Sequence, residues 1–393
     1  MGRNKINFVD LCQGEFGRKI AYTGVDQITP QNVAQVLSDT IGIHNRNRTL
    51  IDYLYRYYKG DQPILYREKL VRPEVNNKVV ENHALETVKF KAGQIYGEPI
   101  QYVCKKKKAS EKTNEQVDRL NDYLDEANAD ARNIQLGIYQ SAVGTAYKAI
   151  LREDEWTENR DLPPFRIFIP SPQDVYIIYS SVTGKPMLSV QILKDEDNQQ
   201  YYQCYSSRQY FKIQNGAVTE SGINGFGGIP IVEYPNNHDR LSDIEIAITM
   251  YDAINKYQSD RLNGVEQFVQ ALMKFKNCEI DEQEFLKMIK LGAVSVKDVG
   301  NGTQSDVDMM TAELNQSESQ VAKDDIYNNM LIVEAMPNRQ SNTGGDTGNA
   351  VYLRNGWDFA ERDAKLVEAF TKEAEKASAR IIFPSHDVEL ASS

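Results

Sequence analysis

The residues in this chain that are best suited to chemistry are two short acidic pairs. Asp195 and Asp197 flank Glu196, and Asp306 and Asp308 flank Val307. Paired carboxylates are common ligands of divalent cations, so either pair could hold a metal ion. Both pairs lie in stretches that read as polar turns, where acidic side chains are most often simply solvated. We therefore predict no metal site and no cofactor.

Other catalytic motifs that spacing can reveal are missing from the sequence. It contains no GxxxxGK[ST] phosphate loop, no GxSxG elbow and no HExxH helix. The glycines of stretch 222–228 lack the strand–turn–helix context of a dinucleotide site. His83 has no second His or Cys at ligand spacing, so a local hydrogen bond is the better interpretation. We predict that the chain is not an enzyme.

Composition limits what the chain can bind. Its 393 residues include 45 Lys and Arg and 56 Asp and Glu, a net charge of −11. Such a protein does not grip nucleic acid over a broad basic surface, although DNA could pass it without being held. No apolar run approaches the length needed to cross a bilayer, so no membrane partner is expected. The four cysteines form no CxxC pair, and the N-terminus lacks a signal-peptide core, which favours a reducing compartment.

The longest amphipathic stretch begins at Ser242, and it sets the organisation of the chain. Its apolar residues recur at helical spacing from Ile244 to Leu272, which predicts one helix of about thirty residues with Ser242 as N-cap. A second helix is expected over 317–335, ending before Pro337. Between them, strands at 273–280 and 292–299 flank a helix at 281–291, followed by a turn at 300–306. The two helices form either a stalk that carries a small domain or an ordinary core hairpin.

The rest of the chain reads as an α+β body with a helical end. Helices are expected from Ile28, over 43–58, over 83–96 with Asn82 as N-cap, and over 115–128 and 133–143. Strands follow, including a β-meander over 187–221 with an Asn-Gly turn. Residues 337–349 form a glycine-rich polar loop, and a last helix runs from about 349 to 381 before a short tail.

Several stretches together resemble the portal proteins of tailed bacteriophages, of the siphovirus type. They are Tyr-Tyr-Lys-Gly at 57–60, GQIYGEPIQY at 93–102, IPIVEYPNN at 229–237 and Gly-Asn-Ala-Val-Tyr-Leu at 348–353. These are turn and packing signatures rather than catalytic motifs, and it is their order and spacing that is specific. The likeness covers roughly residues 28–380.

The resemblance implies an α+β portal fold divided into named regions. They are an N-terminal arm (1–27), a wing (28–240), a first stem helix (241–272), a small α/β clip (273–314), a second stem helix (315–335), a tunnel loop (336–349), and a long helix with a short crown or tail (350–393). Many relatives carry a larger helical crown, so this part is either abbreviated or folded differently here.

The resemblance also implies a function. Portal proteins form a ring of twelve subunits at one capsid vertex, through which double-stranded DNA is packaged by the terminase large subunit and later ejected. Further implied partners are head-completion or adaptor proteins at the head–tail joint, and the major capsid and scaffolding proteins. The implied location is the virion, with assembly in the host cytoplasm. Two alternatives remain: a metal-dependent nucleic-acid enzyme using the acidic turns, and a monomeric structural adaptor.

Three groups of functional residues follow, none of them catalytic or metal-binding. Ring assembly is expected along the first stem helix at Ile244, Ile248, Tyr251, Ile254, Leu262 and Val265. Terminase and connector binding is expected in the clip at Lys276, Glu282, Lys287, Lys290 and Lys297. DNA contact is expected in the tunnel loop at Asn338, Arg339, Gln340, Ser341, Asn342 and Thr343.

Overall fold

The computed structural model describes residues 5–70, 73–104, 111–152, 163–269, 272–276, 283, 286, 306–310, 316–339, 351–352, 355–382 and 390–392. The chain divides into two compact units. The body comprises Met1–Pro63, Glu81–Asp252 and Asn328–Ser393, and the second unit comprises Ile64–Val80 and Ala253–Tyr327. No helix among the described residues is both long enough and apolar enough to span a membrane.

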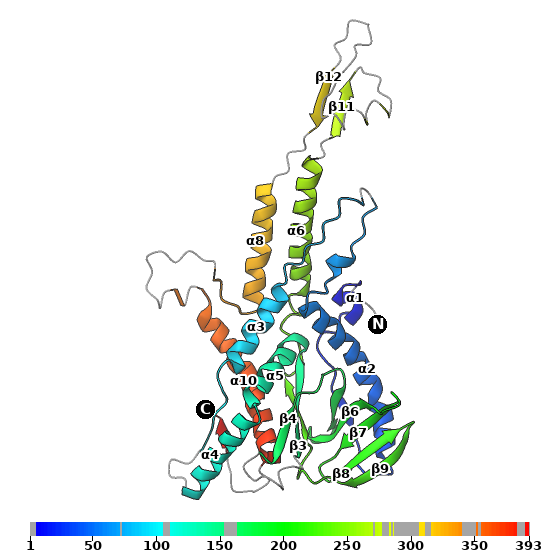
Figure 1. Ribbon diagram of the computed structural model, residues 1–393, viewed down its shortest axis with the longest axis vertical. Helices are drawn as coiled ribbons and strands as arrows, with labels where there is room; N and C mark the ends of the chain where they lie inside the picture. The colour runs from blue at the N-terminus through cyan, green and yellow to red at the C-terminus, as the bar shows by residue number, and fades with distance from the viewer. Residues whose placement is uncertain are drawn as a thin grey trace. The chain divides into compact units, whose positions relative to one another are not determined.

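The body is built on a six-stranded sheet with the order β1-β5-β6-β7-β8-β9 (Figure 1). Strands β6 (Pro186–Lys194), β7 (Gln200–Tyr205), β8 (Gln209–Gln214) and β9 (Ala217–Ile223) form an antiparallel meander, as the alternating sequence predicts. Asn215 and Gly216 both have positive φ, so the predicted Asn-Gly pair makes the tight turn between β8 and β9. Strand β5 (Val175–Ser180) continues the sheet.

The N-terminal residues take part in this sheet, although the sequence carried few cues for them. After the short helix α1 (Phe8–Cys12), strand β1 (Ala21–Thr23) pairs in parallel with β5, with Ala21 opposite Ile178. A parallel partner so far along the chain leaves no local turn signal, because the two strands are not joined by a hairpin. A second sheet has the order β10-β3-β4 and contains β3 (Thr145–Arg152), β4 (Phe165–Phe168) and β10 (Ile231–Pro235).

Helix α2 (Val33–Tyr58) covers one face of the large sheet, with Val33, Val36 and Leu37 packed in one cluster with strand residues such as Ile178 and Phe211. The prediction of two helices in this region was wrong. Gly42 lies inside the single helix with no atom near its missing Cβ, and Pro30 lies in the turn that precedes the helix. One internal glycine costs only about 1 kcal/mol, which tertiary packing offsets.

A second apolar cluster joins the remaining helices to the smaller sheet. Helices α3 (His83–Tyr96), α4 (Glu111–Glu126), α5 (Ala129–Val143) and α10 (Trp357–Ile382) surround it. Asn82 caps α3 by accepting a hydrogen bond from the Leu85 backbone, as predicted. Val351 and Tyr352 are helical, as expected, but Gly356 adopts a left-handed φ of +81° and α10 begins only at Trp357. In the short tail that follows, β13 (Leu390–Ser392) pairs with β2 (Tyr102–Cys104).

Two long helices, α6 (Ile248–Val269) and α8 (Gln316–Val333), run from the body into the second unit. Within the second unit they lie side by side, since Arg261 donates to the Gln320 side chain and the Lys323 ammonium lies 3.1 Å from the Gln258 amide oxygen. The segment 64–80, which begins with the end of the 3-10 turn Pro63–Tyr66, packs on α6: Arg67 pairs with Asp260 at 2.7 Å. The mixed helices and sheets confirm the α+β fold class.

The second unit also contains a two-stranded antiparallel ladder of β11 (Leu272–Lys276) and β12 (Asp306–Met310). The apolar spacing had predicted that the helix reaches Leu272, but Leu272 begins strand β11. Strand β12 was not predicted, because Asp306 had been assigned to a turn. Apart from Gln283 and Leu286, the helix and the strand expected between 281 and 299 lie outside the described residues.

Candidate functional site

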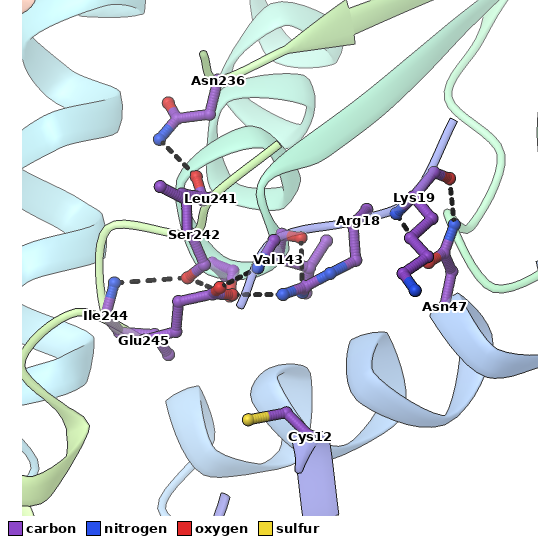
Figure 2. Close-up of polar contacts among 12 residues, drawn as sticks. Cys12, Arg18, Lys19, Asn47, Val143, Asn236, Leu241, Ser242, Ile244 and Glu245 are labelled. Carbon is purple, nitrogen blue, oxygen red and sulfur yellow. Dashed lines mark hydrogen bonds and ion pairs between the residues drawn. The ribbon is translucent and has the colours of Figure 1, made fainter. Parts of the chain in front are cut away.

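The first long helix starts from a tightly bonded turn, Ser242–Ala247, which we call the entry turn (Figure 2). The Ser242 hydroxyl lies 3.0 Å from the carbonyl oxygen of Ser141 and 2.8 Å from that of Ala142, at the end of α5. It also accepts a hydrogen bond from the Ile244 backbone at 3.2 Å. Ser242 was predicted to cap the helix, but it binds the end of α5 instead and α6 begins at Ile248.

The backbone around the entry turn approaches α5 so closely that only glycine fits at one position. Gly144 has φ of +86°, and a Cβ there would lie 2.0 Å from the carbonyl oxygen of Arg240. Asn236 bridges the same region through a hydrogen bond of 3.1 Å to the carbonyl of Leu241 (Figure 2). The start of the long helix is therefore fixed to the body by backbone packing.

Glu245 of the entry turn is bound by the N-terminal segment. Its carboxylate forms a buried ion pair with Arg18 and accepts the Gly17 backbone N–H at 2.5 Å, while Arg18 also donates to the carbonyl of Val143 at 3.1 Å (Figure 2). Gly17 has φ of +80°, and a Cβ there would lie 2.3 Å from the carbonyl oxygen of Asp239. Glu245 is thus the acceptor of a buried network that involves the N-terminal segment.

Asp243, the other acidic residue of the entry turn, is also buried. Its carboxylate accepts hydrogen bonds from the Ser141 hydroxyl at 2.6 Å and the Asn236 amide at 2.8 Å. Burial raises the pKa of Asp243, and the positive charge of Lys91 and these two hydrogen bonds oppose the shift. Lys91 itself pairs with Asp363 of α10 at 2.6 Å, so its ammonium forms an ion pair with Asp363 and also stabilises the charge of Asp243.

The second long helix ends at a third buried carboxyl, Glu334. Tyr251 of α6 donates to one carboxylate oxygen, and the Thr87 hydroxyl of α3 lies 2.9 Å from the other. Burial raises the pKa of Glu334 to about 8. Nearby, the Asp252 carboxylate accepts the Tyr57 hydroxyl at 2.8 Å, and burial raises the pKa of Asp252 to about 6. Carboxyls at the body ends of both long helices thus hold protons more firmly than in water.

The structure divides the residues predicted to mediate ring assembly into two sets. Ile244, Ile248, Tyr251 and Ile254 are buried within one subunit, each at most 2 % exposed. Leu262 and Val265, farther along α6, are 41 % and 43 % exposed. Val321 on α8 is 69 % exposed. The exposed residues are available to a neighbouring subunit, whereas the buried set already has partners within its own chain.

The predicted tunnel loop is described only at its beginning. The Asn338 backbone donates to the carbonyl of Asn355 at 3.0 Å, and its side-chain amide contacts Asn328 at 3.0 Å. Arg339 forms an ion pair with Glu86 of α3. Gln340, Ser341, Asn342 and Thr343 lie outside the described residues. The described beginning of the loop, residues 336–339, is therefore attached to the body.

Little of the predicted clip interface is described. Lys276 ends β11 directly opposite Asp306, and Lys274 lies opposite Asp308. Asp306 and Asp308 thus occupy a strand, with lysines at the facing ladder positions, and not a polar turn. The remaining predicted clip residues lie outside the described part of the chain: Glu282, Lys287, Lys290 and Lys297.

The other candidates for metal chemistry have structural roles. One oxygen of Asp195 accepts the backbone N–H groups of Asp197 and Gln199, at 3.1 and 2.8 Å, and the other accepts the Gln214 amide at 3.0 Å. His83 lies between Glu86, at 3.0 Å, and Glu81, at 3.4 Å. The described residues contain no cluster of three potential metal ligands.

Comparison with known proteins identifies the family. A family model described as "Phage portal protein, SPP1 Gp6-like" matches residues 37–389. The chain belongs to this family of portal proteins. The match confirms the resemblance seen in the sequence. It also makes the chain a structural component of a phage particle, with a portal or connector role, and not an enzyme.

Solved structures and curated sequences were also compared with this portal family member. One similar structure is described as the neck of a native GTA particle computed with C12 symmetry, with a TM-score of 0.49, 11% identity, and coverage of 87% of this chain and 83% of that chain. Another is the neck of an empty GTA particle computed with C6 symmetry, with a TM-score of 0.48, 10% identity, and coverage of 79% and 80%. No curated protein matches significantly.

Two features of the site were missed by sequence reasoning. The Arg18–Glu245 pair joins residues 227 positions apart, so no local pattern could reveal it. Glu334 did carry a signal, because it follows the apolar run Met330–Val333 and precedes Ala335 and Met336. A carboxylate enclosed by apolar neighbours at a helix end is a candidate for a buried polar contact.

Proposed function

We propose that this portal family member forms a ring of twelve subunits at a capsid vertex and that double-stranded DNA enters and leaves through its channel. The family match carries this proposal. The paired helices α6 and α8 support it, because Leu262, Val265 and Val321 expose apolar surface along them in a single subunit. In a cyclic ring each subunit presents two different faces to its neighbours, and side-by-side helices would cover such residues.

Charge supports a channel through which DNA moves without being held. The net charge of −11 disfavours tight binding of phosphate. The loop of residues 336–349 would supply weak contacts, since Arg339 is its only basic residue and is paired with Glu86. We infer that Asn338, Arg339 and the residues 340–343 line the channel and touch the DNA backbone without reading sequence.

The proposed partners follow from the same role. A chain without an ATPase motif needs a separate motor to package DNA. The terminase large subunit would be this motor, and it would bind to the clip (273–314) during packaging. Head-completion or adaptor proteins would take the same place afterwards, while the capsid and scaffolding proteins would surround the wing. Assembly would occur in the host cytoplasm before the particle matures.

Electron microscopy and native mass spectrometry of the purified protein test this function together. The expected result is a ring with a central hole and a mass of twelve subunits. A stable monomer at micromolar concentration would contradict the proposal and favour a monomeric adaptor. A closed ring of another number would retain the channel but correct the stoichiometry.

A further inference from the structure

The end of α8 is held by a group of hydroxyls around one carboxyl. The chain reverses there, with the Met336 N–H donating to the carbonyl of Leu331 at 2.8 Å and Ala335 in a left-handed conformation at φ of +51°. A non-glycine residue adopts this conformation only when surrounding contacts impose it. The reversal directs Glu334 into the body, where it is 2 % exposed.

We propose that Glu334, Tyr251 and Thr87 form a proton-operated latch that holds the beginning of the 336–349 loop against α3. Thr87 connects the two parts, because its hydroxyl lies 2.9 Å from the Glu334 carboxyl and 3.2 Å from the Met336 sulfur. One turn of α3 thus binds both the carboxyl at the end of α8 and the first residue of the loop. The ion pair between Glu86, next to Thr87, and Arg339 adds a second attachment.

The hydrogen-bonding capacity of the three groups depends on one proton. The Tyr251 and Thr87 hydroxyls lie 3.0 Å apart, and both contact Glu334. With Glu334 ionised, the hydroxyls supply only two protons, and both are needed by the carboxylate. A protonated Glu334 supplies a third, so Glu334 can donate to Thr87 while Tyr251 donates to the other carboxyl oxygen, and the Thr87 proton is left for the Met336 sulfur. The Thr87 contacts to Glu334 and Met336 then no longer compete for a single proton.

The charges that surround Glu334 favour the protonated form. Asp243 of the entry turn raises its pKa and Lys91 of α3 lowers it, but burial is the largest cause and sets the pKa at about 8. Lys91 pairs with Asp363 of α10, and among the described residues Glu334 forms no ion pair. Ionisation would place a third carboxylate around one ammonium. The simplest relief is entry of water, which requires Glu334 and the adjoining Met336 to leave α3.

The latch should therefore hold most firmly at acidic pH and lose this advantage progressively as the pH rises to about 8. Its contacts lie within one subunit and exist whether or not a ring forms. A role of the latch in DNA passage rests on the proposed function, in which the latch would set how firmly the beginning of the tunnel loop is attached. A local rise in pH would weaken the attachment of residues 336–339 to α3.

Infrared spectroscopy of the whole protein in D2O can follow the proton directly. A protonated carboxyl band should be present at pH 7, disappear with a midpoint near pH 8, and be missing at pH 7 in Glu334→Gln. Tyr251→Phe removes a donor to the carboxylate and should shift the midpoint upward. It also serves as the second variant if Glu334→Gln fails to fold. The absence of a band with a midpoint near pH 8 in the wild type, or the persistence of that band in Glu334→Gln, would overturn the assignment.

Hydrogen exchange of a peptide covering 330–340, corrected for intrinsic rates, tests the release. Because the pKa of Glu334 is about 8 in the closed latch and 4.5 for an ordinary exposed glutamate, opening should increase exchange by up to tenfold per pH unit between these values and level off above pH 8 in the wild type. The increase should be absent in Glu334→Gln, while the matched control Glu86→Gln alters the contacts with Arg339 and His83 but keeps the pH response. Equal pH responses in wild type and Glu334→Gln would overturn the latch. Ring formation, measured separately by native mass, tests the proposed function independently.

Discussion

Arg18 and Glu245 form a buried ion pair that ties the N-terminal segment to the turn from which the first long helix starts (Figure 2). The two side chains are 2 % and 0 % exposed, and Glu245 also accepts the Gly17 backbone N–H. The pair fixes where α6 leaves the body, because the same turn is bonded to the end of α5 through Ser242. The N-terminal residues are thus structural parts of the portal body.

Arg18→Met should therefore destabilise the body strongly. Removing one partner of a buried pair leaves an uncompensated charge and typically costs about 3–5 kcal/mol. Urea unfolding measures the loss, and adding Glu245→Leu should recover part of it. The matched control is Arg362→Ala, which breaks an exposed pair with Asp358 and should cost less than about 1 kcal/mol. Equal stability of Arg18→Met and wild type would contradict a structural role for the pair.

Asp252 should make the stability of the protein fall between about pH 4 and pH 6. Its folded pKa, about 6, lies above the usual aspartate pKa of 3.8, so the folded state binds the proton more tightly and loses this advantage as pH rises. Asp252→Asn should stabilise the protein at pH 7 by up to about 3 kcal/mol and have little effect at pH 3.5. Thermal unfolding across this range provides the measurement, with the exposed Asp26→Asn as control. A pH-independent effect of Asp252→Asn would show that the carboxyl does not titrate as described.

Two substitutions on α6 should separate folding from ring assembly. Ile254→Asp places a charge at a fully buried position and should unfold the subunit. Leu262→Asp lies at an exposed position, so subunit stability should change little while rings are lost. Native mass spectrometry and thermal unfolding distinguish the two, and Lys256→Glu on the exposed surface of α6 is the control. Intact rings in Leu262→Asp would remove Leu262 from the proposed interface.

Charge reversal at Lys287 and Lys290 should weaken terminase binding while leaving rings intact. Contacts of this kind depend on complementary charge, so the loss should be larger at low salt. Binding of purified terminase at two salt concentrations gives the measurement, and Lys185→Glu on the body is the control. Unchanged affinity would place the docking surface elsewhere.

A cysteine placed at Ser341 should crosslink to DNA in filled particles. The expected position is inside the channel, and Ser181→Cys, on an exposed turn of the body, supplies a comparison. Crosslinks from both positions alike would indicate nonspecific reaction. Their complete absence at 341, with other channel positions reactive, would place the loop outside the channel.

Local signals in the sequence were reliable where one short stretch decides the structure. Asn82 predicted the start of α3, and Asn215-Gly216 predicted the hairpin turn, because each acts on residues next to it in the chain. Ser242 misled because its best acceptors belong to α5, a hundred residues earlier. Glu334 and Arg18 have distant partners too, so their burial follows from tertiary contacts and not from sequence spacing.

The parallel pairing of β1 with β5 has a consequence for synthesis on the ribosome. Residues 21–23 are made early but find their partner strand only when residues 178–180 have emerged. Arg18 must wait longer, until Glu245 appears 227 residues later. At typical translation speeds that delay is roughly 10 to 45 s. Strand β1 and Arg18 therefore lack these two partners while most of the body is made, and the earlier contacts open to the N-terminal segment are those with α2, such as the bonds between Asn47 and the Lys19 backbone.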